Sequence, residues 1–320
     1  MPYVSIIIPL YNEEENISDL YSEVTSVLDK NNIDAEVILV DDGSKDKTVE
    51  KLKAIAAGDS RIVVAELRRN FGQTAAMACG IELAKGDVII TLDGDLQNDP
   101  AEIPRMLEGI AEGYDLVAGW RKDRQDAMLS RKIPSMLANK LISKATKVQL
   151  HDYGCTLKAM KSEVAKNIKL YGEMHRFIPA LAAEVGASIK EIPVNHRART
   201  KGVSKYGISR TFRVILDLIT VKFYLGYSTR PLHLFGMAGL GCGVVGGLTL
   251  ALIIFQRIFL SIPAGSRPLL ALSVLLILVG VQFLCFGLLA EMLVRTYHES
   301  QSKKVYTVRA VTNCGDIKSA

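Results

Sequence analysis

Val88-Ile-Ile-Thr-Leu-Asp-Gly-Asp-Leu-Gln97 is the stretch that decides the fold of this 320-residue chain. Its apolar first half predicts a short buried strand, and Asp93 and Asp95 follow, with Gln97 at the same spacing. Residues two apart in an extended chain point to the same side, so these three side chains are expected to converge just past the strand's carboxyl end. Open α/β sheets bind ligands at that edge, and carboxylate and amide oxygens suit Mg²⁺ or Mn²⁺. The alternative is a polar turn after a core strand, since an Asp-x-Asp pattern is short and common.

Strands and helices alternate over the first 120 residues. Apolar, β-rich runs predict strands at 3–8, 36–40, 62–67, 88–92 and 116–118. Helical patterns fill the intervals and end near residues 30, 57, 84 and 112. Alternation at this spacing predicts an α/β fold with a mostly parallel sheet.

Polar side chains also gather at the ends of the first two predicted strands. Pro9, Tyr11 and Glu13 end the first, and Asp41 and Asp42 end the second. Neighbouring acidic strand ends repel one another unless a cation or hydrogen-bond donors lie between them. No G-x-G-x-x-G or G-x-x-x-x-G-K-[ST] motif follows a predicted strand, which argues against a dinucleotide-binding fold and a P-loop ATPase. A nucleotide with a metal ion is the simplest occupant, with Asp42 accepting from a base or ribose; a helix-capping turn is the alternative for both aspartates.

The composition separates a polar first part from an apolar last third. The net charge is +5, and basic residues cluster between 120 and 213, which suits a phosphate group or an anionic membrane surface. Nucleic acid is disfavoured as a partner because aromatic residues are not interleaved with these charges.

The five cysteines form no C-x-x-C pair, which indicates reduced thiols and a cytosolic soluble part. The first residues have too short an apolar core for a signal peptide and are expected to form a strand.

Six motifs in order resemble glycosyltransferase family 2. They are Pro9-Leu-Tyr-Asn-Glu13, Val40-Asp-Asp-Gly-Ser44, Arg69-Asn-Phe-Gly72, Asp93-Gly-Asp-Leu-Gln97, Asp152-Tyr-Gly-Cys-Thr-Leu157 and Arg199-Thr-Lys-Gly-Val-Ser-Lys-Tyr206. The last two are similar to the polyprenyl-phosphate branch, which includes dolichol-phosphate mannose synthases, bactoprenol glucosyltransferases and undecaprenyl-phosphate aminoarabinose transferases. Gln97-Asn98 and Asp123-Arg-Gln-Asp126 favour the last of these groups. The resemblance runs from residue 3 to residue 297 and implies a GT-A fold, which is Rossmann-like.

The resemblance also implies a role for each matching residue. The nucleotide would be held by Pro9, Tyr11, Glu13 and Asp42. The metal, Mg²⁺ or Mn²⁺, would be held by Asp93, Asp95 and Gln97. The lipid phosphate would be bound by Arg121, Arg131 and Ser135, and a closing loop would bring Arg199, Ser204 and Lys205 to the donor diphosphate. Arginine suits bidentate phosphate contacts; a solvated basic face is the alternative for residues 121–132.

Asp152 matches a position proposed as a general base in family 2 enzymes. A hydroxyl nucleophile needs such a base, whereas a phosphate monoester, with a second pKa of about 6, is mostly the dianion near pH 7. We therefore expect Asp152 to orient the sugar or arginine side chains, with a local turn cap as the alternative. The residues expected to carry catalysis are Asp93, Asp95 and Asp152. His151, His175 and His196 lack the spacing of a metal site and are expected to be structural.

Two apolar stretches, 232–255 and 269–294, are each long enough to cross a bilayer. Gly239, Gly243 and Gly247 form overlapping G-x-x-x-G steps, which indicate tight packing within the hairpin or between protomers of a homo-oligomer. Basic residues flank the pair of stretches, so the positive-inside rule favours a multi-pass protein of the inner membrane with both termini in the cytoplasm. Residues 209–227 have the pattern of an amphipathic helix in the membrane interface, with a soluble core helix as the alternative.

The expected organisation is a GT-A domain at 1–208, an amphipathic region at 209–228, two transmembrane helices at 229–296 and a cytoplasmic tail at 297–320. The expected function is transfer of one sugar, with inversion, from a UDP- or GDP-linked donor to a polyprenyl phosphate, for cell-envelope glycan or lipopolysaccharide modification. A processive polysaccharide synthase is one alternative, but its Q-x-x-R-W motif is absent because the only tryptophan is Trp120. A catalytically inactive assembly protein is the other, and intact Asp93 and Asp95 argue against it.

Overall fold

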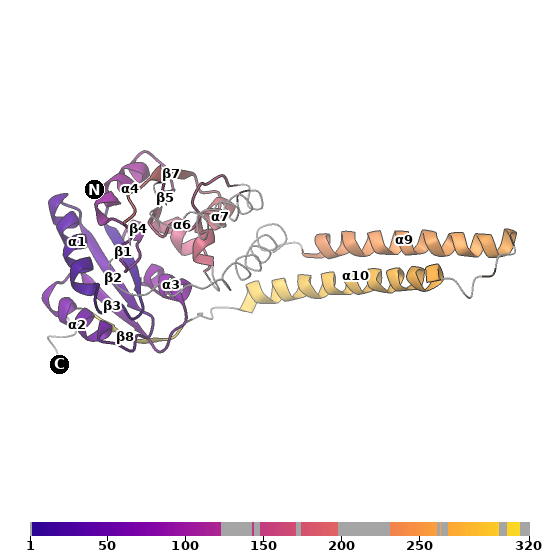
Figure 1. The fold of residues 1–320 in the computed structure, drawn as a ribbon, viewed down its shortest axis with the longest axis horizontal. Coiled ribbons are helices and arrows are strands. Elements are labelled where there is room, and N and C mark those ends of the chain that lie inside the picture. Colours follow the sequence, from indigo (N-terminus) through magenta and orange to yellow (C-terminus); the bar gives the residue numbers. More distant parts are fainter. Residues whose placement is uncertain are drawn as a thin grey trace. The chain divides into compact units, whose positions relative to one another are not determined.

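The structure is a computed structural model that describes residues 2–122, 143, 148–170, 174–197, 231–260, 263, 268–300 and 306–313 (Figure 1). The chain divides into two compact units, Met1–Val221 with Lys304–Ala320, and Lys222–Lys303. Several expected features lie outside the described residues, namely Arg131, Ser135, Arg199, Ser204, Lys205 and the amphipathic helix at 209–228. The finer domain borders expected from the sequence stay predictions.

The centre of the first unit is a parallel sheet. Its strands are β1 (Val4–Leu10), β2 (Ala35–Asp41), β3 (Ile62–Leu67) and β4 (Val88–Thr91), in the order β3-β2-β1-β4. Ile6 of β1 pairs with Val37 on one side and Ile90 on the other. The strands are almost uniformly apolar because both faces of a parallel sheet are covered. The four strands expected here are confirmed.

Three further strands extend the sheet beyond β4. They are β5 (Leu116–Trp120), β6 (Lys158–Lys161) and β7 (Ile189–Pro193). β6 lies antiparallel between β4 and β5, and β7 runs parallel to β5, giving the order β7-β5-β6-β4-β1-β2-β3-β8. β6 is antiparallel to β4 and begins at the carboxyl edge of the parallel sheet, where Lys158 pairs with Thr91 at the end of β4.

Helices cover the sheet because successive strand residues point to opposite faces. The helical elements are α1 (Ile17–Lys30), α2 (Thr48–Gly58), α3 (Gln73–Leu83), η1 (Pro100–Glu102), α4 (Ile103–Ala111), α6 (Ser162–Asn167), η3 (Met174–Phe177) and α7 (Ile178–Glu184). Ile6 and Ile8 share one buried core with α1, whose apolar residues recur at helical spacing. Ile7 faces the other way, where an added Cβ on Gly80 of α3 would lie 2.3 Å from its side chain. Small residues therefore let α3 approach the strands that carry the site.

The last strand comes from the end of the chain. β8 (Val308–Thr312) pairs antiparallel with β3, with Ala65 opposite Val311, and closes that edge of the sheet (Figure 1). The sequence predicts only a cytoplasmic tail at 297–320, so this strand is a finding of the structure. The pairing satisfies the backbone groups of β3 that would otherwise face outward, and β8 becomes the edge strand of the sheet.

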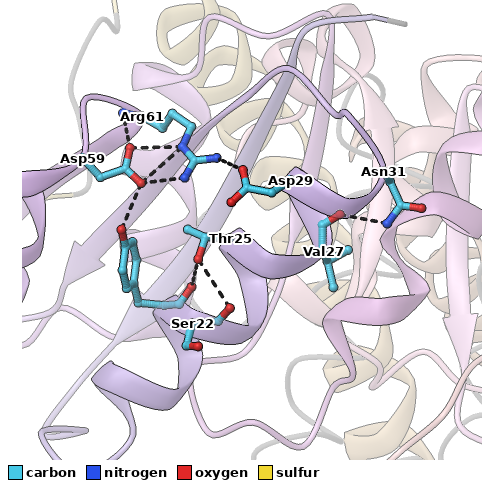
Figure 2. Close-up of polar contacts among 8 residues, drawn as sticks. Ser22, Thr25, Val27, Asp29, Asn31, Asp59 and Arg61 are labelled. Carbon is cyan, nitrogen blue, oxygen red and sulfur yellow. Dashed lines mark hydrogen bonds and ion pairs between the residues drawn. The ribbon is translucent and has the colours of Figure 1, made fainter.

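The amino end of β3 carries a cluster of polar contacts (Figure 2). Arg61, which directly precedes β3, donates to Asp59 at 2.8 Å and to Asp29 of α1 at 2.6 Å. The Tyr21 hydroxyl donates to Asp59 at 3.1 Å. These contacts tie the end of α1 to the turn between α2 and β3, on the edge of the sheet opposite Asp93.

The second unit is a helical hairpin of α9 (Pro231–Phe259) and α10 (Pro268–Ser300). Within it, Phe235–Phe259 and Pro268–Ala290 have the length and composition of membrane spans, yet only 17% and 11% of their most apolar windows are buried. A core helix of a soluble protein would be mostly buried, so these exposed apolar faces support the expected membrane hairpin.

The two helices of the hairpin pack through glycines. An added Cβ on Gly239 would lie 2.6 Å from the carbonyl oxygen of Gly280, and one on Gly246 would lie 2.9 Å from that of Ser273. A Cβ on Gly247 would meet nothing within 4 Å. Gly239 therefore packs within the hairpin as the G-x-x-x-G pattern predicts, whereas Gly247 makes no such contact there and its packing between protomers stays a prediction. Its neighbour Gly246 faces α10 and follows Gly239 at the seven-residue spacing of two helices that pack side by side.

Candidate functional site

The loops after β1 and β2 are held together by hydrogen bonds between polar side chains and backbone groups. The Asn12 N–H donates to Ser44 Oγ at 2.8 Å, and the Asn12 side-chain oxygen accepts from the Lys45 N–H at 2.8 Å. Asn12 has a φ of +50°, a conformation that asparagine tolerates better than most residues. Pro9, Tyr11 and Glu13 line this loop half-buried. The expected nucleotide-binding residues thus lie on a preformed platform.

The Glu13 carboxylate already has a local partner. It accepts from the Asn16 side chain at 2.7 Å, while the Glu13 N–H donates to Thr48 Oγ1 at 3.0 Å. The second contact ties the start of α1 to the start of α2. Glu13 is therefore held in place by contacts within the chain.

Asp41 and Asp42 have different surroundings although they are neighbours at the end of β2. Asp41 accepts from the backbone N–H groups of Gly43 and Ser44, at 3.0 and 3.1 Å, so it closes its own turn before α2 begins at Thr48. Asp42 instead reaches another loop and accepts from the N–H groups of Phe71 and Gly72 at 2.7 and 2.9 Å. Burial raises the pKa of both carboxyls, while these amide donors act in the opposite direction.

The Asp42 carboxylate therefore orders the loop 68–72 between β3 and α3. The turn after β2 lies directly against this loop, and only a glycine fits at the contact. An added Cβ on Gly43, whose φ is +71°, would lie 2.4 Å from the backbone of Arg69. Each oxygen of Asp42 retains a second acceptor site. The residue can thus shape the loop and still accept one hydrogen bond from a ligand.

The chain turns after β4 and does not stay extended. β4 ends at Thr91, and a turn follows at residues 94–96 in which Leu96 has a φ of +60°. The extended geometry assumed for Asp93 to Gln97 is therefore wrong. The burial still alternates, because Gly94 and Leu96 are buried while Asp93, Asp95 and Gln97 are half-buried. A left-handed conformation at a leucine is strained and is commonly kept at functional sites.

Asp93 is held by side chains from two other elements. Gln73 at the start of α3 donates to one carboxylate oxygen at 2.7 Å, and Thr156 donates to the other at 2.6 Å. Burial, and then the nearby charge of Asp95, raises the pKa of Asp93 to about 6. Two carboxylates in this position are a site where a cation is favoured.

The oxygen atoms of Asp93, Asp95 and Gln97 are of the type that binds a hard divalent ion. In the part of the chain that the structure describes, no three His, Cys, Asp or Glu side chains are grouped as a metal site. Two carboxylates and an amide are nevertheless what Mg²⁺ and Mn²⁺ use when substrate phosphates supply the remaining oxygens. Asp95 accepts from the Gln97 N–H at 3.1 Å, and both oxygens of Asp93 accept from side chains, so the orientation of each carboxylate is set by contacts within the chain.

Arg121 and Asp152 form a bidentate ion pair at the carboxyl end of β5. Arg121 Nε donates to one oxygen of Asp152 at 2.7 Å, and a terminal nitrogen donates to the other at 2.9 Å. The side chains are 12% and 4% exposed. The remaining N–H groups of the guanidinium are not used in this pair. Asp152 is thus placed as the partner that orients Arg121.

A buried lysine lies behind this pair. Lys158 of β6 is 2% exposed, and its ammonium donates to the Cys155 carbonyl. Burial lowers the pKa of Lys158, and the charges of Asp152 and Asp93 act in the opposite direction. Lys158 is thus a buried basic group whose electrostatic partners include both acidic positions.

The three histidines have structural partners. His175 Nδ1 lies 2.7 Å from Thr74 Oγ1, and His196 forms an isolated bridge with Asn98. His151 stacks on Trp120, with ring centroids 4.3 Å apart, and pairs with Glu191. They contact different elements.

The segment before the expected closing loop is anchored to the acidic turn. The Arg197 N–H donates to the Gln97 carbonyl at 2.9 Å, and the Arg197 guanidinium pairs with Asp99 at 2.7 Å and Glu23 at 2.6 Å. Arg197 is the last described residue before Arg199, Ser204 and Lys205. The chain therefore leaves the described part next to Gln97.

Sequence reasoning missed the residues that hold the acidic groups. Gln73 and Thr156 donate to Asp93, and Lys158 is buried with its ammonium on the Cys155 carbonyl. Gln73 directly follows the Arg69-Asn-Phe-Gly72 motif, and Thr156 lies inside the Asp152 motif. The position of Gln73 and Thr156 in or next to motifs was a signal that they belong to the site. Their common partner Asp93 could not be read from the sequence, because it lies 20 and 63 residues away along the chain.

Comparison with known proteins gives a consistent result across the chain. The sequence model of the family described as Glycosyl transferase family 2 matches residues 5–169, which include β1, the acidic turn and Asp152. The chain is 47% identical over 312 residues to the dodecaprenyl-phosphate galacturonate synthase of Rhizobium johnstonii, covering 96% of this chain and 92% of that protein. It is 39% identical over 318 residues to the undecaprenyl-phosphate 4-deoxy-4-formamido-L-arabinose transferase of Aeromonas hydrophila subsp. hydrophila, covering 99% and 96%.

Solved structures of similar fold include glucosyl-3-phosphoglycerate synthase from Mycobacterium tuberculosis in complex with Mn²⁺, UDP and phosphoglyceric acid. Its TM-score is 0.55 at 19% identity, covering 70% of this chain and 79% of that one. This likeness supports the GT-A-like fold of the first unit.

Proposed function

Because the chain belongs to glycosyltransferase family 2, we propose that it moves a single sugar from a UDP- or GDP-linked donor to a polyprenyl phosphate such as undecaprenyl phosphate. Cell-envelope glycan or lipopolysaccharide modification is the setting that fits such a product. The observation that carries the proposal is one sheet edge where the acidic turn of Asp93 and Asp95 meets the paired cation Arg121.

The donor would lie over the loops after β1 and β2. Pro9, Tyr11, Glu13 and Asp42 would hold the nucleotide, since this platform is preformed and Asp42 keeps acceptor capacity. A polar, prearranged surface reduces the ordering cost of binding. The comparisons leave both the nucleotide and the hexose open.

The acidic turn would hold the donor diphosphate through a metal ion. Asp93, Asp95 and Gln97 would be its protein ligands, with Asp93 held in a fixed orientation. Mg²⁺ or Mn²⁺ would neutralise the leaving diphosphate. Gln73 and Thr156 keep Asp93 from rotating away.

The acceptor phosphate would bind at Arg121, with Arg131 and Ser135 as its expected partners. Asp152 fixes the guanidinium plane by two hydrogen bonds, which leaves donors on its other edge for a phosphate oxygen. That oxygen would attack the anomeric carbon while the bond to the nucleoside diphosphate breaks, with inversion at that carbon. The phosphate is mostly a dianion near pH 7, with a second pKa of about 6, so Asp152 has no proton to take.

The segment after Arg197 would close over the donor. Two residues of extended chain reach about 7 Å, so the anchor of Arg197 on Gln97 supports a role for Arg199 at the diphosphate. Ser204 and Lys205 would act from the same loop.

The hairpin would place both of its ends on the cytoplasmic side. β8 follows the hairpin in the chain and yet pairs with β3 of the unit that precedes it, so a pair of spanning helices must begin and end on one side. Flanking basic residues favour the cytoplasm.

This topology is tested by labelling. In a variant without Cys242, Cys285 and Cys314, Ala264→Cys between the helices should react with a reagent outside the cell. A tag after Ala320 should be reached only from inside. Reaction of Ala264→Cys from inside alone would reject the arrangement.

The activity is tested by incubating membranes with polyprenyl phosphate, Mn²⁺ and each of a panel of UDP- and GDP-sugars, and identifying the lipid product by mass. We expect one sugar added to the polyprenyl phosphate with one donor, and no product from Asp95→Ala. A polymeric product would indicate a processive synthase. Absence of both transfer and nucleotide-sugar hydrolysis with every donor would favour an inactive assembly protein.

A further inference from the structure

We propose that the C-terminal strap, residues 306–312, positions the loop 68–72 at the donor site, so that donor binding depends on the segment that follows the membrane hairpin. The inference rests on the proposed function, because it assumes a nucleotide at the platform of β1 and β2. It concerns a part of the chain that is remote in sequence from every expected site residue.

The strap holds the loop at its first residue. β8 runs along β3, with Glu66 opposite Ala310, and the pairing passes an irregularity between Glu66 and Leu67. The Arg68 N–H then donates to the Thr307 carbonyl at 3.0 Å. The ladder therefore continues beyond the end of β3 into the loop itself.

The strap also holds the helix on the other side of the loop. Tyr306 is 8% exposed, and its hydroxyl donates to the Glu82 carboxylate on α3. Burial raises the pKa of Tyr306, so it remains a neutral donor. α3 begins at Gln73, directly after the loop. The strap thus touches both elements that the loop connects.

The loop and the first residue of α3 are hydrogen-bonded to two residues of the expected donor site. Phe71 and Gly72 donate to Asp42 at 2.7 and 2.9 Å, and Gln73 donates to Asp93 at 2.7 Å. A shift of the loop by a fraction of an ångström would lengthen these hydrogen bonds, whose strength falls steeply with geometry. Asp42 on the nucleotide side and Asp93 on the metal side would both be affected.

A purely structural role predicts a different outcome. Without β8, β3 would become an exposed edge, which favours aggregation and lowers stability. Such a loss would leave the affinity of the remaining folded protein for a nucleotide unchanged. Donor affinity, measured separately from stability, therefore distinguishes positioning from edge protection.

The experiment uses the full-length protein in lipid nanodiscs, with UDP and GDP, each with Mn²⁺, as probes in calorimetric titrations. Tyr306→Phe removes one hydrogen bond and should weaken binding of the preferred nucleotide about threefold. A stop codon in place of Tyr306 should weaken it at least about tenfold, since the ladder is lost as well. In steady-state assays the KM for the donor should rise in both variants, while the KM for polyprenyl phosphate stays unchanged.

Matched variants distinguish the loss of the Tyr306–Glu82 hydrogen bond from a general change in β8. Arg309→Gln changes an exposed position of the same strand and should bind the nucleotide as the wild type does. Glu82→Gln keeps an acceptor for the Tyr306 hydroxyl and should also bind normally, whereas Glu82→Ala should behave as Tyr306→Phe.

The outcomes separate this inference from the proposed function. If the wild type binds neither nucleotide, the donor class is wrong and the inference falls with it. If the wild type binds one nucleotide and a folded Tyr306→Phe binds it equally well, the strap does not position the donor site, and the proposed function stands. Equal effects on donor and acceptor KM would also reject positioning of the donor loop.

Discussion

Two arginine–aspartate pairs lie at opposite edges of the same sheet. Arg61 and Asp59, at the amino end of β3, lie 2.8 Å apart with side chains 33% and 10% exposed (Figure 2). Arg121 and Asp152, at the carboxyl end of β5, lie 2.7 Å apart with side chains 12% and 4% exposed. The first pair joins residues two apart in the chain, and the second joins residues 31 apart.

The difference teaches what each pair is for. Arg61 closes a local turn near solvent, where an ion pair contributes about 0–1 kcal/mol to stability. Arg121 and Asp152 are withdrawn from water, and the desolvation of both charges offsets most of their attraction. A buried pair beside Asp93 is therefore better explained by chemistry at that edge than by stability. Changes at the amino edge should affect stability alone, and changes at the carboxyl edge should affect activity.

The largest effect is expected at Asp95. Asp95→Ala should abolish transfer to polyprenyl phosphate, because an expected ligand of the metal is removed. Asp59→Ala, at the opposite edge, should retain activity and is the matched control. Glycolipid formation with Mn²⁺ measures both. Full activity of Asp95→Ala in excess chelator would show that the acidic turn holds no essential metal.

The next effect is expected at Arg121. Arg121→Gln should lower kcat/KM for the acceptor roughly tenfold to a hundredfold, since a hydrogen bond to a charged group contributes about 1.5–3 kcal/mol. The KM for the donor should change little. Arg61→Gln should leave both values unchanged. If donor KM rises and the acceptor response is unaltered in Arg121→Gln, the acceptor role belongs to another residue.

The pH–rate profile of Asp152→Asn tests the role of the buried pair. Asp152→Asn keeps the shape of the pair but loses the charge, so we expect a lower rate with saturating substrates. The acidic limb of the pH–rate profile should remain, because the acceptor phosphate, with a second pKa of about 6, sets it. Loss of that limb in the variant would identify Asp152 as the titrating base.

The smallest effect is expected for the stability contribution of Arg61. Hydrogen bonds from Arg61 lower the pKa of Asp59. A carboxyl with a lowered folded pKa contributes stability above its unfolded pKa of about 3.9, and that contribution is lost as the pH falls through the folded value. Arg61→Gln should therefore lower the Tm by a few degrees at pH 7, and the difference from the wild type should shrink below pH 4. Thermal unfolding at both pH values tests this, and an equal difference at both would contradict it.

The part of the fold that could be predicted is the part with local signals. β1 to β4 are continuous apolar runs, and the helices between them carry the helical spacing of apolar residues. β6 reads Lys-Ala-Met-Lys and β8 reads Val-Arg-Ala-Val-Thr, and neither carries such a signal. Both are strands because a neighbouring strand offers them a backbone ladder, which depends on position in space.

The candidate site divides in the same way. Asp93, Asp95 and Asp152 are recognisable in the sequence by residue type and motif. Their hydrogen-bond partners are not, because Gln73, Thr156 and Arg121 reach them from other elements. The turn at Leu96 also replaced the extended geometry that the spacing predicts.

The sequence by itself determined the family, the α/β order of the first unit, the acidic strand end and the two apolar helices. It could do so because periodicity, apolar length and motif spacing are local properties of the chain. Only the tertiary structure decided that Arg121 pairs with Asp152, that Gln73 and Thr156 fix Asp93, and that the last strand returns to β3. These contacts join residues far apart in sequence, so their free energy arises only once the sheet brings their elements together.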